Sequence, residues 1–457
     1  MTPNRSRHAL LLALLASASG VAAEPDARCH AGAYTLDDGR FVDLAAVSDP
    51  AQLRWRMLDG RSGRLTRAAD GTWTSTLGWT TRNDGVAVEL GDCAKGRIRF
   101  DGHEGRRQTF AITDTTFEGN GVKLRGRLVL PEGDQRVPIV VAVHGSEDTS
   151  AVQRFHTQYL YPAHGIGVFV YDKRGTGESS GKYTQDFHLL AADAKAALAE
   201  ARRLAGTRAA RIGFDGGSQG GWVAPLAASD SDADFVVVGY GLAESPLAED
   251  REQVMLDLRK AGYGDDVLAK ARDVTDATGV IVASRGARGW EQLDAVRAKY
   301  GQLPWWQALK GEFTGQVVSH SREELMAMAP KLEKGTTWDY DPMPVLRGLR
   351  VPQLWVLAAN DTEAPPVETR RRLLDLAAQG HPITTVVFPD TDHGILEYET
   401  DAQGERTSTR YADGYYRLLI DWIRTRRFDE TPYGRALITL PTKPTASRQS
   451  DATRGRN

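Results

Sequence analysis

The distribution of apolar residues changes along the chain and divides it into regions of different predicted structure. Between residues 29 and 110, short runs of strand-forming residues alternate with turn signals such as Asp59-Gly60 and Asp70-Gly71. Turns about every ten residues, with tryptophans between them, are typical of a small antiparallel β-sheet. We therefore predict a β-rich N-terminal module over residues 24–112. The sequence leaves open whether it is a binding module or a structural appendage.

From residue 113 to residue 428, continuous apolar runs alternate with segments of helical periodicity. Uninterrupted apolar runs are expected of strands that are buried on both faces. The apolar runs are residues 138–143, 168–170, 235–238 and 354–357. A segment with helical periodicity, residues 189–204, lies between two of them. Alternation of this kind predicts an α/β fold with a mostly parallel sheet flanked by helices.

The strand signal disappears over residues 245–339, where polar, helix-forming segments predict a helical insertion. Because the insertion falls between two strands whose carboxyl ends face the same edge of the sheet, we expect it to form a cap over a site there. Adjacent side chains on a helix point about 100° apart. We therefore predict that Trp305 or Trp306 helps to bind substrate. The alternative is that both only pack the cap against the sheet.

Residues 1–23 have the layout of a secretory signal peptide. Arg5 and Arg7 precede an apolar run over residues 9–16, and small residues lead to Ala23. A membrane anchor needs about 20 apolar residues, about twice the length found here. We therefore predict cleavage after Ala23 and an exported protein, periplasmic or secreted, with no membrane span.

Two cysteines, Cys29 and Cys93, follow the predicted signal. In an exported protein an isolated pair is expected to form a disulfide, which would stabilise the fold by about 4 kcal/mol by closing a loop of roughly 65 residues. Two buried thiols or an incomplete pair of metal ligands are the alternatives.

The remaining composition narrows the range of partners. Residues 429–457 are rich in Arg, Thr, Ser and Pro, which predicts a C-terminal tail that is disordered at its end. The formal net charge of −3 gives no basic excess to attract a phosphate backbone, so nucleic acid is not an expected partner.

The strongest local signal is a serine with glycines two positions away on each side, Gly216-Gly217-Ser218-Gln219-Gly220. This pattern matches the nucleophile elbow, a strand-to-helix turn so tight that only glycine avoids a clash. A phosphate-cradling loop is the alternative. No Lys-Ser or Lys-Thr pair and no ribose-binding acid accompany the glycines, which argues against a nucleotide site.

A serine hydroxyl is a weak nucleophile, so Ser218 requires a histidine base and an acid that orients the histidine. Asp361 follows the predicted strand 354–357, and His393 follows another strand-like run. The carboxyl ends of such strands gather site residues at one edge of a doubly wound sheet. We therefore predict a catalytic triad of Ser218, His393 and Asp361.

Other carboxylates near the histidine are alternatives to Asp361. Asp390 and Asp392 are close to His393 in sequence, but neighbours in an extended loop point elsewhere. Glu363 is the realistic competitor.

The tetrahedral intermediate of acyl transfer also needs hydrogen-bond donors for its oxyanion. One donor is expected from the backbone amide that follows the nucleophile, here Gln219. The other is expected from the loop after the run 138–143, where the Ser146 amide is our candidate and Gly145 permits close approach.

Together these motifs resemble the α/β-hydrolase superfamily over about residues 115–428. The motifs occur in the family's order at residues 143–146, 171–181, 216–221, 360–361 and 392–394. The sequence looks most like bacterial carboxylesterases and, more distantly, dienelactone hydrolases and prolyl-oligopeptidase-type peptidases. The resemblance implies the fold, the triad order Ser, Asp, His, and the oxyanion hole. It also implies no metal and no organic cofactor.

We therefore predict an enzyme that cleaves a small-molecule carboxylic ester through an acyl-enzyme intermediate. A serine peptidase of the prolyl-oligopeptidase type is the alternative, because the same triad cleaves amides. A third hypothesis is a catalytically inactive binding protein on the same fold. One departure from many relatives is that Glu147 and Asp148 replace further glycine, and their charge should disfavour anionic substrates. The sequence does not determine the oligomeric state.

Overall fold

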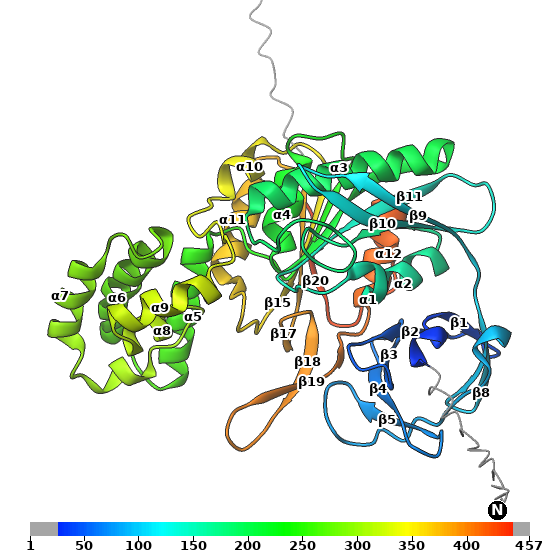
Figure 1. The fold of residues 1–457 in the computed structure, drawn as a ribbon, viewed down its shortest axis with the longest axis horizontal. Helices are drawn as coiled ribbons and strands as arrows, with labels where there is room; N and C mark the ends of the chain where they lie inside the picture. The colour runs from blue at the N-terminus through cyan, green and yellow to red at the C-terminus, as the bar shows by residue number, and fades with distance from the viewer. Residues whose placement is uncertain (1–25, 442–457) are drawn as a thin grey trace, which may run out of the picture.

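A computed structural model describes residues 26–441 of the chain. A β module (blue), a central sheet flanked by helices, and a helical lobe are visible in Figure 1. Among the described residues, none of the helices combines the length and the apolar character that a membrane span requires. The predicted signal peptide, residues 1–23, lies outside the described part of the chain.

The β module is a single antiparallel sheet, as predicted. Its strands lie in the order β5-β4-β3-β2-β1-β8-β7-β6. Alternate side chains, among them Leu44, Leu53, Trp55 and Phe100, form a small core. The strands are β1 (Gly32–Leu36), β2 (Phe41–Ala46), β3 (Gln52–Met57), β4 (Ser62–Arg67), β5 (Trp73–Leu77), β6 (Val88–Leu90), β7 (Arg97–Phe100) and β8 (His103–Arg107).

The predicted disulfide between Cys29 and Cys93 is present. It joins two short 3₁₀ turns, η1 (Ala27–His30) and η2 (Cys93–Lys95). The two cysteines are 64 residues apart in the sequence. The two Cα atoms are 5.7 Å apart, a normal separation for a disulfide. The bridge thus ties the start of the module to the connection between β6 and β7.

Replacing both cysteines, as Cys29→Ser with Cys93→Ser, is expected to lower the free energy of unfolding of the module by about 4 kcal/mol, because the unfolded chain regains loop entropy. Urea unfolding followed by tryptophan fluorescence measures this. A reducing agent should destabilise the wild type and leave the double variant unchanged. Equal unfolding midpoints for the oxidised wild type and the variant would contradict the prediction.

The central sheet has nine strands in the order β20-β16-β15-β14-β13-β11-β12-β10-β9. The six strands from β16 to β12 are parallel, while β9, β10 and β20 are antiparallel edge elements. The mostly parallel sheet is as predicted. The strands are β9 (Phe110–Glu118), β10 (Lys123–Pro131), β11 (Val137–Val143), β12 (Gly167–Tyr171), β13 (Ala209–Gly217), β14 (Val236–Gly239), β15 (Gln353–Ala358), β16 (Ile383–Phe388) and β20 (Leu437–Thr439).

The chain reverses its direction of winding at β11. It passes from β11 to β12 on one side and then returns to β13 on the other side. In sheets of this kind, the carboxyl ends of the two strands at the reversal form a crevice that binds ligands. Here the crevice lies between the loops that follow β11 and β13.

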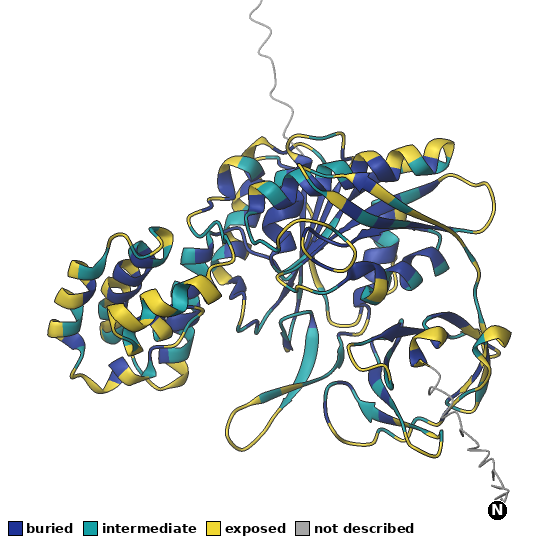
Figure 2. Ribbon diagram, in the orientation of Figure 1, coloured by how far each residue is buried: buried dark blue, intermediate teal, exposed yellow. Residues whose placement is uncertain are grey.

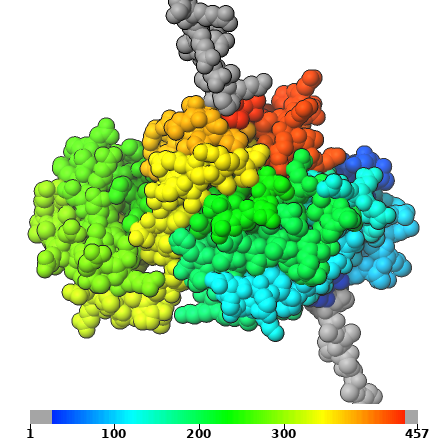
Figure 3. All heavy atoms as spheres, turned by 90° about the horizontal axis from the view of Figure 1, so that it is seen from above, coloured from blue at the N-terminus to red at the C-terminus, as the bar shows by residue number. Residues whose placement is uncertain are grey.

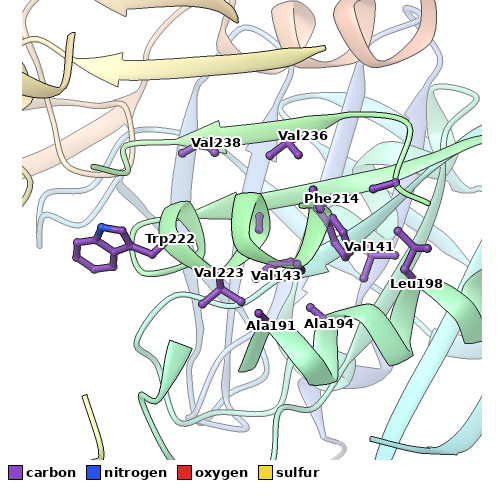
Figure 4. Packing of buried hydrophobic residues seen from close by; sticks show 14 of the residues in the cluster. Val141, Val143, Ala191, Ala194, Leu198, Phe214, Trp222, Val223, Val236 and Val238 are labelled. Atoms are coloured by element: carbon purple, nitrogen blue, oxygen red, sulfur yellow. The ribbon is translucent and has the colours of Figure 1, made fainter. Parts of the chain in front are cut away.

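Helices cover both faces of the central sheet. Val141, Phe214 and Val236 pack against α3 and α4 on one face, as Figure 4 shows, and the adjacent residues Val140 and Val237 belong to the core on the other face. Figure 2 accordingly shows the inner strands fully buried. The first face carries α3 (Phe187–Ala205), α4 (Gly220–Ala228), α10 (Met343–Gly348) and α11 (Pro366–Ala378), and the second carries α1 (Ala151–Arg154), α2 (Thr157–Ala163) and α12 (Tyr415–Thr425).

The predicted insertion over residues 245–339 is helical, and it forms a lobe at one end of the molecule rather than a layer over the sheet (Figures 1 and 3). The lobe has its own apolar core between α5 and α6. Its helices are α5 (Pro246–Lys260), α6 (Asp265–Ala283), α7 (Trp290–Tyr300), η4 (Pro304–Ala308), α8 (Thr314–Ser319) and α9 (Arg322–Leu332).

Three details differ from the predicted organisation. The β module ends before residue 110, because β9 already belongs to the central sheet. The tail is not wholly unstructured, because its residues 437–439 form β20 against β16. A hairpin of β18 (Leu396–Thr400) and β19 (Arg406–Tyr411), preceded by β17 (Thr391–Asp392), follows the candidate histidine and contacts β4 of the module.

Candidate active site

Ser218 occupies a sharp turn between β13 and α4. Its φ is +54°, in the left-handed region that residues with a side chain rarely adopt. A Cβ on Gly216 would lie 2.6 Å from the carbonyl oxygen of Gly220, and one on Gly220 would lie 3.0 Å from those of Val143 and His144. Glycine is therefore required on both sides of the serine, as the elbow pattern predicted.

His393 and Asp361 come together from two loops at the carboxyl edge of the sheet. His393 Nδ1 lies 3.0 and 3.1 Å from the two carboxylate oxygens of Asp361. Asp361 is buried and accepts hydrogen bonds from the backbone N–H groups of Glu363 and Ala364, at 3.0 and 2.8 Å. The carboxylate is thereby held in place, and it leaves Nε2 of the histidine available.

The charges around His393 favour its protonated form. Burial lowers the pKa of His393, but the hydrogen bond to Asp361 and the charges of Asp361, Glu363 and Asp392 outweigh burial, so that the pKa is raised above its usual value. The imidazolium that forms when the histidine accepts a proton is therefore stabilised.

The three alternative acids lie elsewhere, and Asp390 pairs with Arg435 at 2.5 Å. Glu363 is near Nε2 rather than Nδ1, at 3.6 Å, and its side chain is 72% exposed. Asp392 accepts hydrogen bonds from the backbone N–H groups of Thr362 and His393, both at 2.9 Å, and pairs with Arg406 at 2.8 Å. Asp392 therefore ties the histidine loop to the Asp361 loop and does not contact the imidazole.

Ser218 and His393 line one cavity of about 460 Å³ at the crevice between β11 and β13. Within residues 26–441, Ser218 Oγ has no hydrogen-bond partner, so the two side chains share the cavity without a hydrogen bond between them. In a protein without bound substrate, such hydrogen bonds are often long and tighten only when the substrate binds.

The loop that carries Ser146 also lines this cavity, and two side chains hold its carbonyl groups. Lys173 Nζ donates to the Gly145 carbonyl at 2.8 Å, and the Tyr183 hydroxyl donates to the Ser146 carbonyl at 2.5 Å. In a trans peptide, C=O and N–H point in opposite directions. Fixing the Gly145 carbonyl therefore also fixes the direction of the Ser146 N–H.

Lys173 is 1% exposed, and burial lowers its pKa to about 8 against the opposing charges of Glu147 and Asp148. Glu147 faces the same cavity. Burial raises its pKa, but hydrogen bonding and charge from His144 outweigh burial and lower the pKa below its usual value. The sequence analysis missed Lys173, although it stands next to Asp172 in the motif at residues 171–181.

Trp305 and Trp306 do not lie in this site. Both indoles are buried in the core of the lobe, 3% and 6% exposed, among side chains of α5 and α6. No residue of the range 245–339 is among those that line the cavity at Ser218. The expectation that one of the two indoles faces a substrate pocket is therefore not met, and the packing alternative describes their positions.

Two groups of side chains in the described part of the chain have the composition of a metal site. One is Cys29 with His30 and Cys93, in which the disulfide engages both sulfurs. The other is the exposed set of Asp37, Asp38 and His103. Both lie in the β module, away from the residues that line the Ser218 cavity.

Comparison with known proteins agrees with this geometry. Residues 134–254, which include Ser146, Lys173 and Ser218, match the sequence profile of the family described as serine aminopeptidase, S33. The strand order and the elbow are those of the α/β-hydrolase fold, and the match covers the part of the sheet that carries the elbow. No protein with a curated description has a significantly similar sequence.

Three solved structures illustrate the range of similar folds. The acylaminoacyl peptidase of Pyrococcus horikoshii is 15% identical with a TM-score of 0.43, and the alignment covers 85% of this chain but only 57% of the peptidase. An esterase of Pyrococcus furiosus is 15% identical with a TM-score of 0.40, covering 62% of this chain and 84% of the esterase. The proline iminopeptidase of Mycobacterium smegmatis is 20% identical with a TM-score of 0.36, covering 62% of this chain and 91% of that enzyme.

Proposed function

We propose that the protein is a serine carboxylesterase. The observation that carries the proposal is the hydrogen-bonded pair of His393 and Asp361 in the same cavity as Ser218, which stands on a strained elbow. Ser218 Oγ attacks the ester carbonyl while His393 Nε2 takes its proton. The N–H groups of Ser146 and Gln219 bind the oxyanion.

The tetrahedral intermediate then collapses and breaks the bond to the alcohol oxygen. His393 returns the proton to this oxygen, so that a neutral alcohol leaves and the acyl group stays on Ser218. A water molecule, deprotonated by the same histidine, attacks the acyl enzyme and releases the carboxylic acid. Asp361 keeps the histidine in the tautomer that each of these steps requires.

A panel of 4-nitrophenyl esters compared with aminoacyl 4-nitroanilides tests the proposal, with enzyme inactivated by a fluorophosphonate as the blank. We expect kcat/KM for the best ester to exceed that for the best anilide. A higher kcat/KM on an anilide would replace the esterase by a peptidase.

A specific observation favours an aminopeptidase as the second candidate. The base of the lobe contacts the Asp361 loop, because Gln253 on α5 donates to the Glu363 carbonyl at 2.5 Å. On the same helix, burial and the charges of Glu312, Asp361 and Glu363 raise the pKa of Glu249 well above its usual value. A cationic group would relieve this repulsion, and the free amino terminus of a peptide is such a group. The anilide arm of the panel therefore includes substrates with free and with acetylated amino groups.

The raised pKa of His393 predicts the pH dependence. Only neutral His393 accepts the serine proton, so kcat/KM should fall as the pH decreases through a value above the usual 6.5. A profile of kcat/KM from pH 5 to pH 9 measures the lower limb. An apparent pKa below 6.5 on that limb would contradict the effect of Asp361 described above.

Lys173 is expected to act as a positioning residue. Replacing it as Lys173→Met removes the donor to the Gly145 carbonyl, so that the Ser146 N–H loses its fixed direction. We expect kcat to fall by about tenfold to hundredfold with little change in KM, since an oxyanion donor acts mainly in the transition state. Lys182→Met, an exposed lysine of the same loop, is the control. Equal loss in both variants, or a loss confined to KM, would refute this role.

A further inference from the structure

We infer that the cavity beside Ser218 is an acyl pocket for an aromatic acid with a hydroxyl group on its ring, and that the β module completes this pocket. The inference rests on the proposed ester hydrolysis and names its substrate class. It depends on three features of the cavity: its aromatic walls, a set of buried polar atoms without partners, and its connection to the β module.

The walls of the cavity are largely aromatic. Phe155 and Tyr161 line it together with Tyr411 at the end of β19 and Tyr415 and Tyr416 at the start of α12. The ring of Tyr411 lies 4.9 Å from that of Tyr416, and the ring of Tyr240 lies 4.8 Å edge-on from His393. Aromatic side chains bind an aryl group by offset stacking and edge contacts. The volume of about 460 Å³ suits one such group.

Four residues of the cavity lining have a buried polar atom without a hydrogen-bond partner in the described part of the chain. One of these atoms, Glu147 Oε1, lies 3.1 Å from His144 Nδ1 as an ion-pair neighbour. The other three are His156 Nε2, Thr157 Oγ1 and the Tyr416 hydroxyl. Native proteins leave few buried polar groups unpaired, and an unpaired set beside a cavity indicates a ligand group or a water molecule as the partner. A purely alkyl acyl chain would leave all three unpaired.

The character of these atoms selects a neutral hydroxyl. Burial, followed by the charge of Arg56, holds the pKa of His156 well below its usual value, so its imidazole is neutral. A neutral imidazole and a tyrosine hydroxyl offer both donors and acceptors. A phenolic hydroxyl both donates and accepts a hydrogen bond, so it can pair with the imidazole and with the tyrosine hydroxyl. The nearby cation is already engaged, because Arg56 pairs with Asp43 at 3.2 Å.

The β module builds one wall of the pocket. Arg56 on β3 donates to the Tyr411 hydroxyl at 3.5 Å. The hairpin that carries Tyr411 is bonded to the module through its backbone, with Tyr411 N–H donating to the Gly60 carbonyl at 2.9 Å. A Cβ on Gly60 would lie 2.2 Å from the Tyr411 carbonyl, and one on Gly78 would lie 2.3 Å from that of Thr409. Two module turns therefore need glycine to approach the hairpin, which Figure 1 shows beside β4 and β5.

The acyl side is assigned from the order of the reaction. The alcohol departs early, next to His393, whereas the acyl group stays on Ser218 until water attacks. Asp215 precedes Ser218 by three residues on β13, accepts a 2.5 Å hydrogen bond from Tyr161, and lines the same cavity as Ser218. We therefore assign this cavity to the group that remains bound to Ser218.

The first test compares the methyl esters of 4-hydroxycinnamic, cinnamic and hexanoic acids. We expect kcat/KM for the hydroxylated ester to exceed that for the cinnamate by about tenfold, the value of one hydrogen bond. Tyr416→Phe should remove this preference by lowering the hydroxycinnamate rate far more than the cinnamate rate. Tyr340→Phe is the matched control, because it deletes another buried, unpaired hydroxyl that does not line the cavity.

The second test concerns the module. The paired change Arg56→Met with Asp43→Asn removes both charges, so neither is left buried alone. We expect an about tenfold loss of kcat/KM on the hydroxycinnamate and a clearly smaller loss on the hexanoate. Circular dichroism checks that the paired variant folds. If the paired variant does not fold, the Tyr416→Phe comparison decides the pocket inference.

Binding to the inactive Ser218→Ala protein separates this inference from the proposed function. Calorimetry should show that 4-hydroxycinnamate binds about tenfold more tightly than cinnamate. If the wild type hydrolyses no ester but this preference is found, the esterase proposal fails and the pocket stands. If esters are hydrolysed but the hydroxyl has no effect on rate or binding, or hexanoate is preferred, the pocket inference is overturned and the esterase stands.

Discussion

Ser218→Ala is expected to abolish ester hydrolysis, with kcat falling by about 10⁵-fold to 10⁶-fold. The substitution removes the oxygen atom that forms the bond to the acyl group. Ser218 is the residue that the elbow presents to the cavity. A fluorophosphonate probe should label the wild type at Ser218 and leave the variant unlabelled. Ser229→Ala, at the far end of α4, is the control and should keep full labelling. Labelling that persists in Ser218→Ala would show that another residue is the nucleophile.

Asp361→Asn is expected to lower kcat by about 10⁴-fold with little change in KM. An amide at this position carries no charge, and its NH₂ group donates to Nδ1, so His393 loses the tautomer and the charge stabilisation that catalysis needs. The raised pKa of His393 should fall as well, and the lower limb of the pH profile should shift to lower pH.

Glu363→Gln is the matched control, because Glu363 is the other carboxylate near the imidazole but is 72% exposed and lies at Nε2. We expect this variant to change kcat by less than about tenfold, in line with the small effect of exposed charges. A large loss in Glu363→Gln together with a small loss in Asp361→Asn would reverse the assignment of the acid.

Local steric requirements explain why the elbow was predictable. The glycines at 216 and 220 are needed by contacts within a few residues of Ser218 or with the adjacent strand β11, so their requirement appears in a short stretch of sequence. The mostly parallel sheet was predictable for a similar reason, because strands buried on both faces read as continuous apolar runs.

Trp305 and Trp306 show where periodicity fails. The prediction assumed that neighbouring side chains on a helix point in different directions, so that only one is buried. In the structure they stand on the 3₁₀ turn η4, and side chains from α5 and α6 surround both of them. Burial depends on everything that packs around a segment, and sequence spacing describes only the segment itself.

The short strand β20 and the hairpin of β18 and β19 escaped prediction because their pairing is not local. The three residues of β20 have no strand pattern of their own and are defined by hydrogen bonds to β16. The hairpin acquires its role only when Gly60 and Gly78 of the distant β module meet it. Likewise, nothing near Gly145 in sequence indicates that Lys173 holds its carbonyl.

The sequence by itself determined the class of fold, the β module with its disulfide, and the elbow serine Ser218 with a candidate acid and histidine after it in the chain. These follow from apolar periodicity, the count of cysteines, and steric or chemical demands that act over a few residues. The tertiary structure alone decided which carboxylate meets His393 Nδ1, which side chains hold the loop of Ser146, and which rings line the cavity. Those contacts join segments that are far apart in the chain, and their geometry depends on how the sheet, the module and the hairpin pack together.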